Sequence, residues 1–371
     1  MTLKKKPQKI AWWQPKIEKE NYTFLKKALD SNYINEGPQT AEFEKAILKL
    51  TGAKYALATN NCTTAMFLSL KALGIGPGDQ VIVPDITFIA TANAVSLSGA
   101  EPVLVDTRKE DLTMDPLAFQ KAITSRTKAV IPVHVSGRSA QIEEIMAIAE
   151  KRNLKVIEDA AETIGSYRKG KHLGTFGITG CFSFAANKTI STGQGGMVVT
   201  DNEEIYLKLR PLINQGRTKL GTGGDDVHNT IGFNFRMTDL QAAMGLGQLK
   251  HLNERTKRMR RNYELYSMNL GNVKGLRIYP ADTKAGELLQ WTDAFTERRD
   301  ELVKYLVERN IDCRNYWMPI HRQMAYKMPD DNFPNSTYSS PLSLWLPSAF
   351  TLTDKDILKV CQEIKNFLLP R

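Results

Sequence analysis

One lysine, Lys188, stands where a side-chain amine can do chemistry. It follows an apolar, strand-like run at residues 181–186 and precedes a turn that contains Gly193, Gly195 and Gly196. An amine held against apolar strands, partly out of water, is a candidate nucleophile or Schiff-base former. The alternative is a solvated loop lysine, which is the commoner situation for a lysine taken alone. The segment is therefore a candidate site for carbonyl chemistry.

An aspartate upstream shifts the balance between these interpretations. Residues 156–162 read Val-Ile-Glu-Asp-Ala-Ala-Glu, which predicts a buried strand that ends at Asp159. Ligand contacts in α/β proteins lie at the carboxyl ends of parallel strands, and a carboxylate there can keep a pyridine nitrogen protonated. The alternative for Asp159 is a plain helix N-cap. Lysine together with such an aspartate is the pattern of pyridoxal phosphate enzymes.

Several longer motifs follow in order along the chain. They are Glu-Asp-Ala-Ala at 158–161, Phe-Ser-Phe at 182–184, Asn-Lys-Thr at 187–189, Thr-Gly at 192–193, Gly-Gly-Met at 195–197 and Gly-Phe-Asn-Phe-Arg-Met at 232–237. Together they resemble the DegT/DnrJ/EryC1/StrS family of sugar-nucleotide aminotransferases, which are fold-type-I pyridoxal phosphate enzymes. The resemblance runs from about residue 37 to about residue 354. It implies an α/β fold: a large domain with a mixed, mostly parallel seven-stranded sheet and a smaller α/β C-terminal domain.

The resemblance also implies roles for single residues. Lys188 would hold pyridoxal phosphate as a Schiff base and move the proton during transamination, and Asp159 would hold the pyridine nitrogen. Ser183 would help to bind the cofactor phosphate. Glu162 stands where many members have glutamine beside the 3′-oxygen of the cofactor, and Gln194 replaces the more usual glutamate of the glycine turn.

Two more segments would complete the cofactor site. Residues 60–64, Asn-Asn-Cys-Thr-Thr, lie between an expected strand and an expected helix, where backbone N–H groups can bind a phosphate. The resemblance places this contact at Thr63 or Thr64, and a threonine N-cap is the alternative. Phe88 occupies the position at which the family stacks an aromatic ring on the cofactor; a core position is the alternative.

The substrate side is marked less clearly. Arg217 belongs to a loop at residues 215–228 that we expect on the substrate side or the dimer side. Asn234 resembles the residue that one protomer lends to the cofactor phosphate of the other, which implies a homodimer with a shared active site. His321, in a segment that resembles the one closing over the sugar, either binds substrate or caps the fold, and His134 is either an active-site or a structural histidine.

Composition sets the outer bounds. The 371 residues are 42% hydrophobic, which is enough for a large core, and we expect a large domain at 1–250 and a small one at 251–371. The four cysteines lack metal-ligand spacing, so no metal site is expected. Neither a signal segment nor a membrane-spanning run is evident, so we expect a cytoplasmic protein that binds no membrane.

The formal charge of +10 invites a nucleic-acid interpretation, which is strongest at residues 255–261. That cluster continues a helical pattern, so its charges more simply form a solvated helix face, and no nucleic-acid module accompanies it. We therefore expect no nucleic-acid partner. A positive field can still attract an anionic, nucleotide-linked substrate.

These observations predict transamination from L-glutamate to a nucleotide-linked ketosugar. Glu162 and residues 187–190 resemble a subset similar to perosamine synthases, which favours amination at C4 of a GDP-linked 4-keto-6-deoxyhexose. One alternative is a C3 aminotransferase acting on a dTDP-linked 3-keto sugar. Another, of a different class, is a basic binding protein that has lost catalysis. Lys188 argues against the related subgroup of dehydratases, in which a histidine replaces this lysine.

Overall fold

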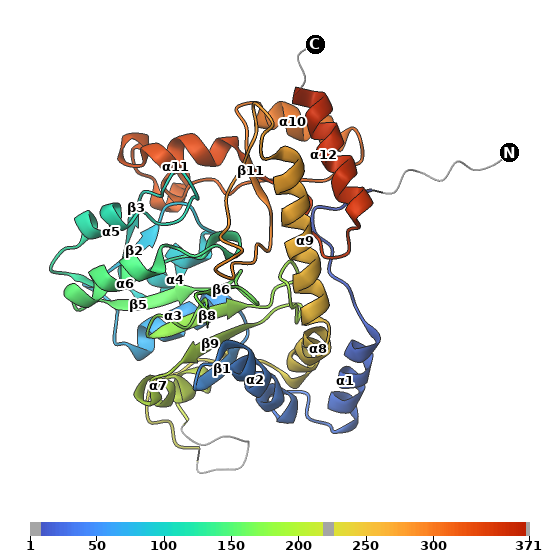
Figure 1. The fold of residues 1–371 in the computed structure, drawn as a ribbon. Helices are drawn as coiled ribbons and strands as arrows, with labels where there is room; N and C mark the ends of the chain where they lie inside the picture. Colours follow the sequence, from blue (N-terminus) through green and yellow to red (C-terminus); the bar gives the residue numbers. More distant parts are fainter. Residues whose placement is uncertain (1–8, 218–225, 369–371) are drawn as a thin grey trace.

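The computed structural model describes residues 9–217 and 226–368 (Figure 1). The helices are α1 (Lys19–Asp30), α2 (Pro38–Thr51), α3 (Cys62–Ala72), α4 (Ala90–Ser98), α5 (Pro116–Ala122), α6 (Ile142–Lys151), α7 (Glu203–Ile213), α8 (Asp239–Leu249), α9 (Leu252–Leu270), α10 (Arg299–Val307), α11 (Pro334–Ser339) and α12 (Asp354–Leu368). The strands are β1 (Tyr55–Thr59), β2 (Gln80–Pro84), β3 (Glu101–Val105), β4 (Thr127–Val130), β5 (Lys155–Asp159), β6 (Tyr167–Arg168), β7 (Lys171–His172), β8 (Thr179–Ser183), β9 (Gly196–Thr200), β10 (Arg277–Ile278), β11 (Asp293–Phe295), β12 (Arg314–Asn315) and β13 (Ser343–Trp345). Short 3-10 helices lie at Val135–Gly137, Ile320–Arg322, Met324–Tyr326, Asp330–Asn332 and Ser340–Leu342.

The central element is a seven-stranded sheet in the order β1-β9-β8-β5-β4-β2-β3. Strand β9 runs antiparallel to both of its neighbours, and the other neighbouring strands are parallel. The expected mixed, mostly parallel sheet is confirmed. Because parallel strands all point the same way, the carboxyl ends of β2, β4, β5 and β8 lie along one edge. That edge carries the candidate site.

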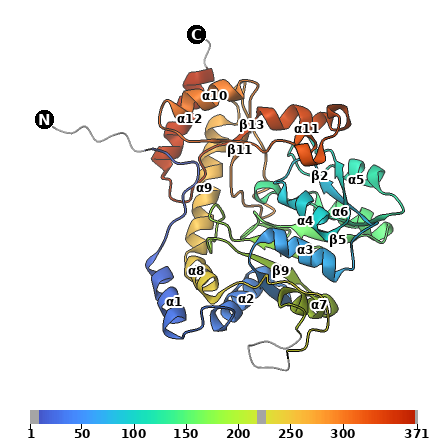
Figure 2. The same cartoon turned by 180° about the vertical axis from the view of Figure 1, so that it is seen from behind.

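Side chains of β2 show how the sheet is buried on both faces. Val81 and Val83 join the apolar cluster beneath α3, α4 and α7. Ile82 points the other way and packs with Phe119 of α5 and Ile145 of α6. Helices α3 and α4 lie in front of the sheet in Figure 2, and α5 and α6 lie in front in Figure 1. Covered strands of this kind are continuous apolar runs rather than alternating ones.

The C-terminal part builds a second sheet of four antiparallel strands, in the order β10-β11-β13-β12. Its own apolar core includes Leu265 of α9, Leu306 of α10 and Ile364 of α12. The core also contains Ile10, which pairs with Ile311, so the N-terminal segment packs into this second unit. Helix α9 extends from α8 to α12 and connects the two units (Figure 1).

Within residues 9–217 and 226–368, no helix combines the length and apolar character needed to cross a lipid bilayer.

Candidate active site

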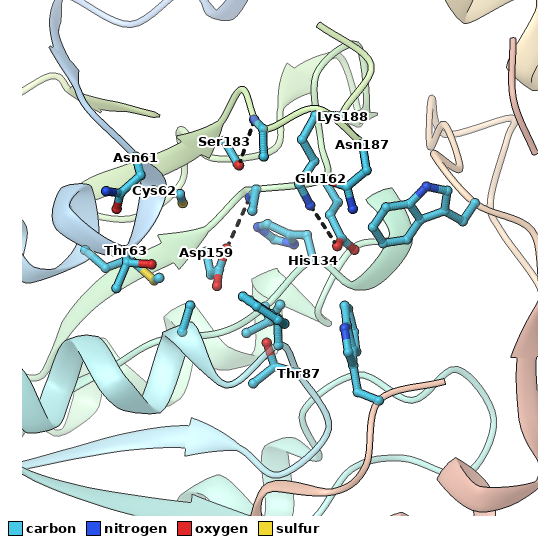
Figure 3. Close-up of a pocket in the computed structure, with 18 of the residues that line it drawn as sticks. Asn61, Cys62, Thr63, Thr87, His134, Asp159, Glu162, Ser183, Asn187 and Lys188 are labelled. Atoms are coloured by element: carbon cyan, nitrogen blue, oxygen red, sulfur yellow. Dashed lines mark hydrogen bonds and ion pairs between the residues drawn. The ribbon is translucent and has the colours of Figure 1, made fainter. Parts of the chain in front are cut away.

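A cavity of about 310 Å³ lies at the carboxyl edge of the seven-stranded sheet. Its wall combines the ends of β5 and β8, the turn between β1 and α3, and the segment that follows β2. Side chains from the four-stranded unit complete the wall. In Figure 3, Lys188 and Glu162 point toward each other, and Asp159 and Ser183 lie in the same cavity. The predicted lysine and aspartate are therefore brought together.

Lys188 lies in the turn after β8, and its side chain is only 11% exposed. Its Nζ is 3.1 Å from Glu162 Oε1 and donates a hydrogen bond to it. The same Nζ lies 4.9 Å from the ring centroid of Trp291, within the range of a cation–π contact. The side chain is thus held inside the cavity between an acid and an aromatic ring. A solvated loop lysine, the alternative interpretation, is not what the structure shows.

Glu162 is fixed at both carboxylate oxygens. Oε1 accepts from Lys188, and Oε2 accepts from the backbone N–H of Ser136 at 2.6 Å. Ser136 itself adopts a left-handed conformation with φ of 56° in this turn. Burial raises the pKa of Glu162, and the positive charge of Lys188 opposes that rise. The ion pair therefore stabilises the charged form of a carboxyl group that burial alone would neutralise.

Asp159 ends strand β5 and faces the cavity while 5% exposed. Its Oδ2 accepts from the hydroxyl of Thr91 at 2.8 Å, and its Oδ1 accepts from the backbone N–H of Ala161 at 3.1 Å. Burial raises the pKa of Asp159, whereas these two donors and the charge of Lys188 lower it. The bond to Ala161 is a contact within a turn, and the next element after β5 is strand β6 rather than a helix, so Asp159 is not the helix N-cap of the alternative interpretation.

The turn between β1 and α3 presents a helix N-terminus to the cavity. Asn61 caps α3, since its side-chain oxygen accepts from the N–H of Thr64 at 2.9 Å. The Thr64 hydroxyl is engaged with Asn60 Oδ1 at 2.7 Å, whereas Thr63 lines the cavity. Of the two threonines between which the sequence left the choice open, the structure brings Thr63 to the wall. Helix N-termini attract anions such as phosphate.

The glycine-rich turn lets β9 approach this helix start closely. A Cβ on Gly196 would lie 2.3 Å from the carbonyl carbon of Asn61 and 2.6 Å from the nitrogen of Cys62. No side chain fits there without displacing backbone. Gly193, in contrast, has φ of 83° and nothing near its Cβ direction. The two glycines thus serve different purposes, close packing and turn geometry.

Three other residues considered from the sequence line the same cavity. Ser183 closes β8, and Phe88 lines the wall while 55% exposed. His134 is fully buried, with Nε2 2.8 Å from Glu158 Oε2. Its Nδ1 accepts from the N–H of Ala140 at 3.1 Å, so Nε2 carries the proton and donates to Glu158. Both ring nitrogens are occupied, which favours the structural interpretation of His134.

Three predicted residues do not line this cavity in the described chain. His321 is fully buried, with Nδ1 2.6 Å from Asp85 Oδ2 and Nε2 3.0 Å from Asp330 Oδ1. This arrangement favours the fold-capping alternative. Arg217 pairs with Asp226 in the loop at 215–228, of which residues 218–225 lie outside the described residues. Asn234 is exposed, and its placement leaves the predicted contact with a partner protomer open.

Trp291, Arg314 and Thr87 also line the cavity and were not singled out from the sequence. Trp291 and Arg314 come from the C-terminal part of the chain, and Thr87 follows β2. Trp317, another lining residue, belongs to the same expected segment as His321. Thr87 Oγ lies 3.0 Å from the hydroxyl of Thr91, the residue that donates to Asp159. Such contacts join segments far apart in sequence, and no local pattern marks them.

The side chains around the cavity fit pyridoxal phosphate by their chemistry. An amine at Lys188 matches the aldehyde of the cofactor, and a buried carboxylate at Asp159 matches its ring nitrogen. The hydroxyl of Ser183 and the N-terminus of α3 match its phosphate. One cavity thus holds a complementary group for each functional part of the cofactor. The fold and this set of residues define a fold-type-I pyridoxal phosphate enzyme.

Comparison with known proteins gives the family. A family model described as the DegT/DnrJ/EryC1/StrS aminotransferase family matches residues 15–365. The chain is 34% identical to a GDP-perosamine synthase of Escherichia coli O157:H7, over 96% of this chain and 98% of that protein. It is 35% identical to a GDP-perosamine synthase of Caulobacter vibrioides, over 96% and 97% respectively. The solved structure of DesV from S. venezuelae, in complex with a ketimine intermediate, superposes with a TM-score of 0.91 at 32% identity and covers 95% of both chains.

The chain belongs to the DegT/DnrJ/EryC1/StrS aminotransferase family. It is a pyridoxal-phosphate-dependent aminotransferase. The alternative of a basic binding protein without catalysis is thereby set aside.

Proposed function

We propose that this enzyme transfers the amino group of L-glutamate to C4 of a GDP-linked 4-keto-6-deoxyhexose. The observation that carries the proposal is the meeting of Lys188 and Asp159 in one buried cavity, in a chain that resembles two GDP-perosamine synthases over nearly its whole length. Glu162, whose residue type resembles that of the subset similar to perosamine synthases, lies 3.1 Å from Lys188 and supports the same substrate class.

Each part of the cavity would hold one part of the cofactor. Lys188 would bind the aldehyde carbon, Asp159 would hold the ring nitrogen, and Glu162 would serve the 3′-oxygen. Ser183 and the start of α3 at Thr63 would bind the phosphate. Phe88, on the cavity wall, would pack against the ring. When bound, pyridoxal phosphate supplies an electron sink that lets a proton leave the carbon next to the nitrogen.

Proton movement is the second task of Lys188. With the cofactor bound and its Nζ free, Lys188 would carry the α-proton of L-glutamate to the cofactor in the first half of the reaction, and would carry a proton from the cofactor to the sugar carbon in the second half. Glu162 accepts a hydrogen bond from this Nζ at 3.1 Å and so fixes its position in the cavity. Trp291 lies against the same Nζ and limits the access of water to it.

The active site is completed, in this proposal, by a second copy of the chain. Asn234 is exposed and does not line the cavity of its own protomer, as we expect of a residue contributed to a partner. Ile231, three residues earlier, is 84% exposed, which suits an apolar contact between protomers.

Mixed dimers test whether Asn234 contributes to the site of the partner protomer. If Lys188→Ala and Asn234→Ala chains are each inactive, random mixing should restore about a quarter of the sites; no recovery would remove Asn234 from the shared site.

The substrate assignment is tested by offering two ketosugars to the purified enzyme with L-glutamate. We expect a GDP-linked 4-keto-6-deoxyhexose to gain an amine at C4, with 2-oxoglutarate formed in equal amount. The Lys188→Ala variant is the control for non-enzymatic amination. Turnover of a dTDP-linked 3-keto sugar alone would replace this assignment with the C3 alternative.

A further inference from the structure

Arg314 is a cation in the cavity wall that lacks an acidic partner within the described residues. Four charged side chains line it: Lys188, Glu162, Asp159 and Arg314. Lys188 and Glu162 pair with each other, and Asp159 accepts two hydrogen bonds. Arg314 has no ion pair and no side-chain hydrogen bond with any residue in the ranges 9–217 and 226–368. A cation that faces a cavity without an acid of its own is available to an anion from outside.

The guanidinium of Arg314 is nevertheless held in place. It lies 5.2 Å from the ring centroid of Trp12 and 5.6 Å from that of Trp345. Trp345 is fully buried, and β12 pairs Arg314 directly with it in the four-stranded sheet. Stacking on aromatic faces orients an arginine without using its N–H donors. The five donors of Arg314 therefore remain free for a ligand.

The platform beneath Arg314 depends on the N-terminal segment. Trp12 lies 5.3 Å from Trp291 and 6.1 Å from Trp345, measured between ring centroids. Trp291 in turn lies against Lys188 at 4.9 Å. A continuous row of aromatic rings thus connects the reactive amine with the unpaired guanidinium. The row fixes the position of Arg314 relative to Lys188.

We propose that Arg314 binds an anionic group of a substrate, either a carboxylate of the amino donor or a phosphate of the nucleotide-linked sugar. The inference rests on the proposed function, because both substrates of that reaction carry such groups. A planar guanidinium binds carboxylate and phosphate through two parallel hydrogen bonds, which a lysine in its place cannot form. Trp12 is a positioning residue that acts through Arg314.

Steady-state kinetics with each substrate varied in turn test the role and identify the anion. For Arg314→Gln we expect the KM of one substrate to rise roughly tenfold or more, with kcat changed far less. A rise in KM for L-glutamate assigns the carboxylate, and a rise in KM for the nucleotide sugar assigns the phosphate.

Arg314→Lys should restore only part of the lost affinity, and Trp12→Leu should raise the same KM. Arg126→Gln, which removes an exposed arginine paired with Glu101 at 2.8 Å, is the matched control. Both KM values unchanged in Arg314→Gln would overturn the proposal.

A binding measurement separates this proposal from the proposed reaction. All five tryptophans of the chain belong to the aromatic cluster around Arg314, so intrinsic fluorescence reports on this site. Cofactor-free protein is titrated with glutarate and with inorganic pyrophosphate. One of these anions should change the fluorescence, with affinity lowered roughly tenfold in Arg314→Gln but not in Arg126→Gln. Equal affinity of the wild type and Arg314→Gln for both anions would contradict the role of Arg314, whatever sugar the enzyme aminates.

Discussion

Lys188 and Glu162 form a buried ion pair in which Nζ and Oε1 are 3.1 Å apart. Because Glu162 is also held by the N–H of Ser136 at 2.6 Å, the amine is positioned from the turn that follows β4 as well as from its own strand. In the absence of cofactor, this pair keeps two buried charges balanced. We propose that this pair holds the amine at the place where the cofactor binds.

Replacing Glu162 by glutamine tests that task. The variant keeps an acceptor for the N–H of Ser136 but removes the negative charge. Since the contact between Nζ and Glu162 must break before the amine attacks an aldehyde, and a neutral amide binds the amine less strongly, pyridoxal phosphate should associate faster with the variant. Stopped-flow absorbance after mixing with cofactor measures the rate. The same rate in wild type and variant at every pH would show that Glu162 does not hold the amine.

Replacing Lys188 by alanine should abolish transamination and leave the fold intact. Lys188→Arg is the matched control, because it keeps a positive charge beside Glu162 but lacks a primary amine. Both variants should lose turnover, and Lys188→Arg should unfold closer to the wild-type temperature, since alanine leaves Glu162 buried without its partner. Thermal denaturation and a glutamate turnover assay measure the two effects. Retained turnover in either variant would contradict the proposed role of Lys188 as the Schiff-base lysine.

Asp159→Asn keeps the shape of the side chain and one acceptor oxygen, but it removes the negative charge. The amide oxygen can still accept from Thr91 or Ala161, so the protein should fold and bind cofactor. A neutral amide does not hold a protonated ring nitrogen, and the rate with L-glutamate should fall roughly 10²-fold or more. Single-turnover absorbance measures this half-reaction by itself. A rate close to that of the wild type would take Asp159 out of the proposed role.

Substitutions at two glycines of one turn should differ in their effect on stability and on cofactor binding. Gly196→Ala places a methyl group 2.3 Å from the carbonyl carbon of Asn61, so the start of α3 must shift, and we expect a loss of about 1–3 kcal/mol in unfolding free energy together with weaker cofactor binding. Gly193→Asn adds a side chain in open space at a positive φ that asparagine tolerates. It should stay near wild type. Chemical denaturation and cofactor titration compare the two.

Glu44 predicts a pH dependence of stability. Its Oε1 accepts from the N–H of Ala58 at 2.8 Å, and burial raises its pKa from 4.5 to about 7. A carboxyl group whose pKa is raised on folding stabilises the fold when protonated, so its contribution is complete below pH 4.5 and is lost as the pH rises through about 7. Glu44→Gln should flatten this part of the profile. Urea denaturation at pH 5 and pH 8 measures it; equal slopes in both proteins would contradict the assignment.

The sequence predicts which residues meet in the candidate site because its motifs are local. Lys188, Asp159 and Ser183 each end or follow a buried strand, and parallel strands bring such ends together. The choice between Thr63 and Thr64 depends on which side chain caps the helix, and Asn61 takes that place. This detail follows from backbone geometry that the residue types alone leave open.

The wall opposite the sheet was not predictable in the same way. Trp291 and Arg314 reach the cavity because the four-stranded unit packs against the large sheet, and no pattern near either residue marks that contact. His321 lies in a recognisable segment, yet its partner Asp85 is 236 residues away. The division into domains near residue 250 stays a prediction, and Ile10 in the second core shows that the N-terminal segment contributes there too.

The most direct test of the central claim is the visible absorbance of the purified protein with pyridoxal phosphate, recorded before and after L-glutamate is added. The account predicts a band of protein-bound cofactor that requires Lys188 and that disappears when glutamate donates its amine. A spectrum identical to that of free cofactor, or a bound band that glutamate leaves unchanged, would contradict the assignment of Lys188 and of glutamate respectively.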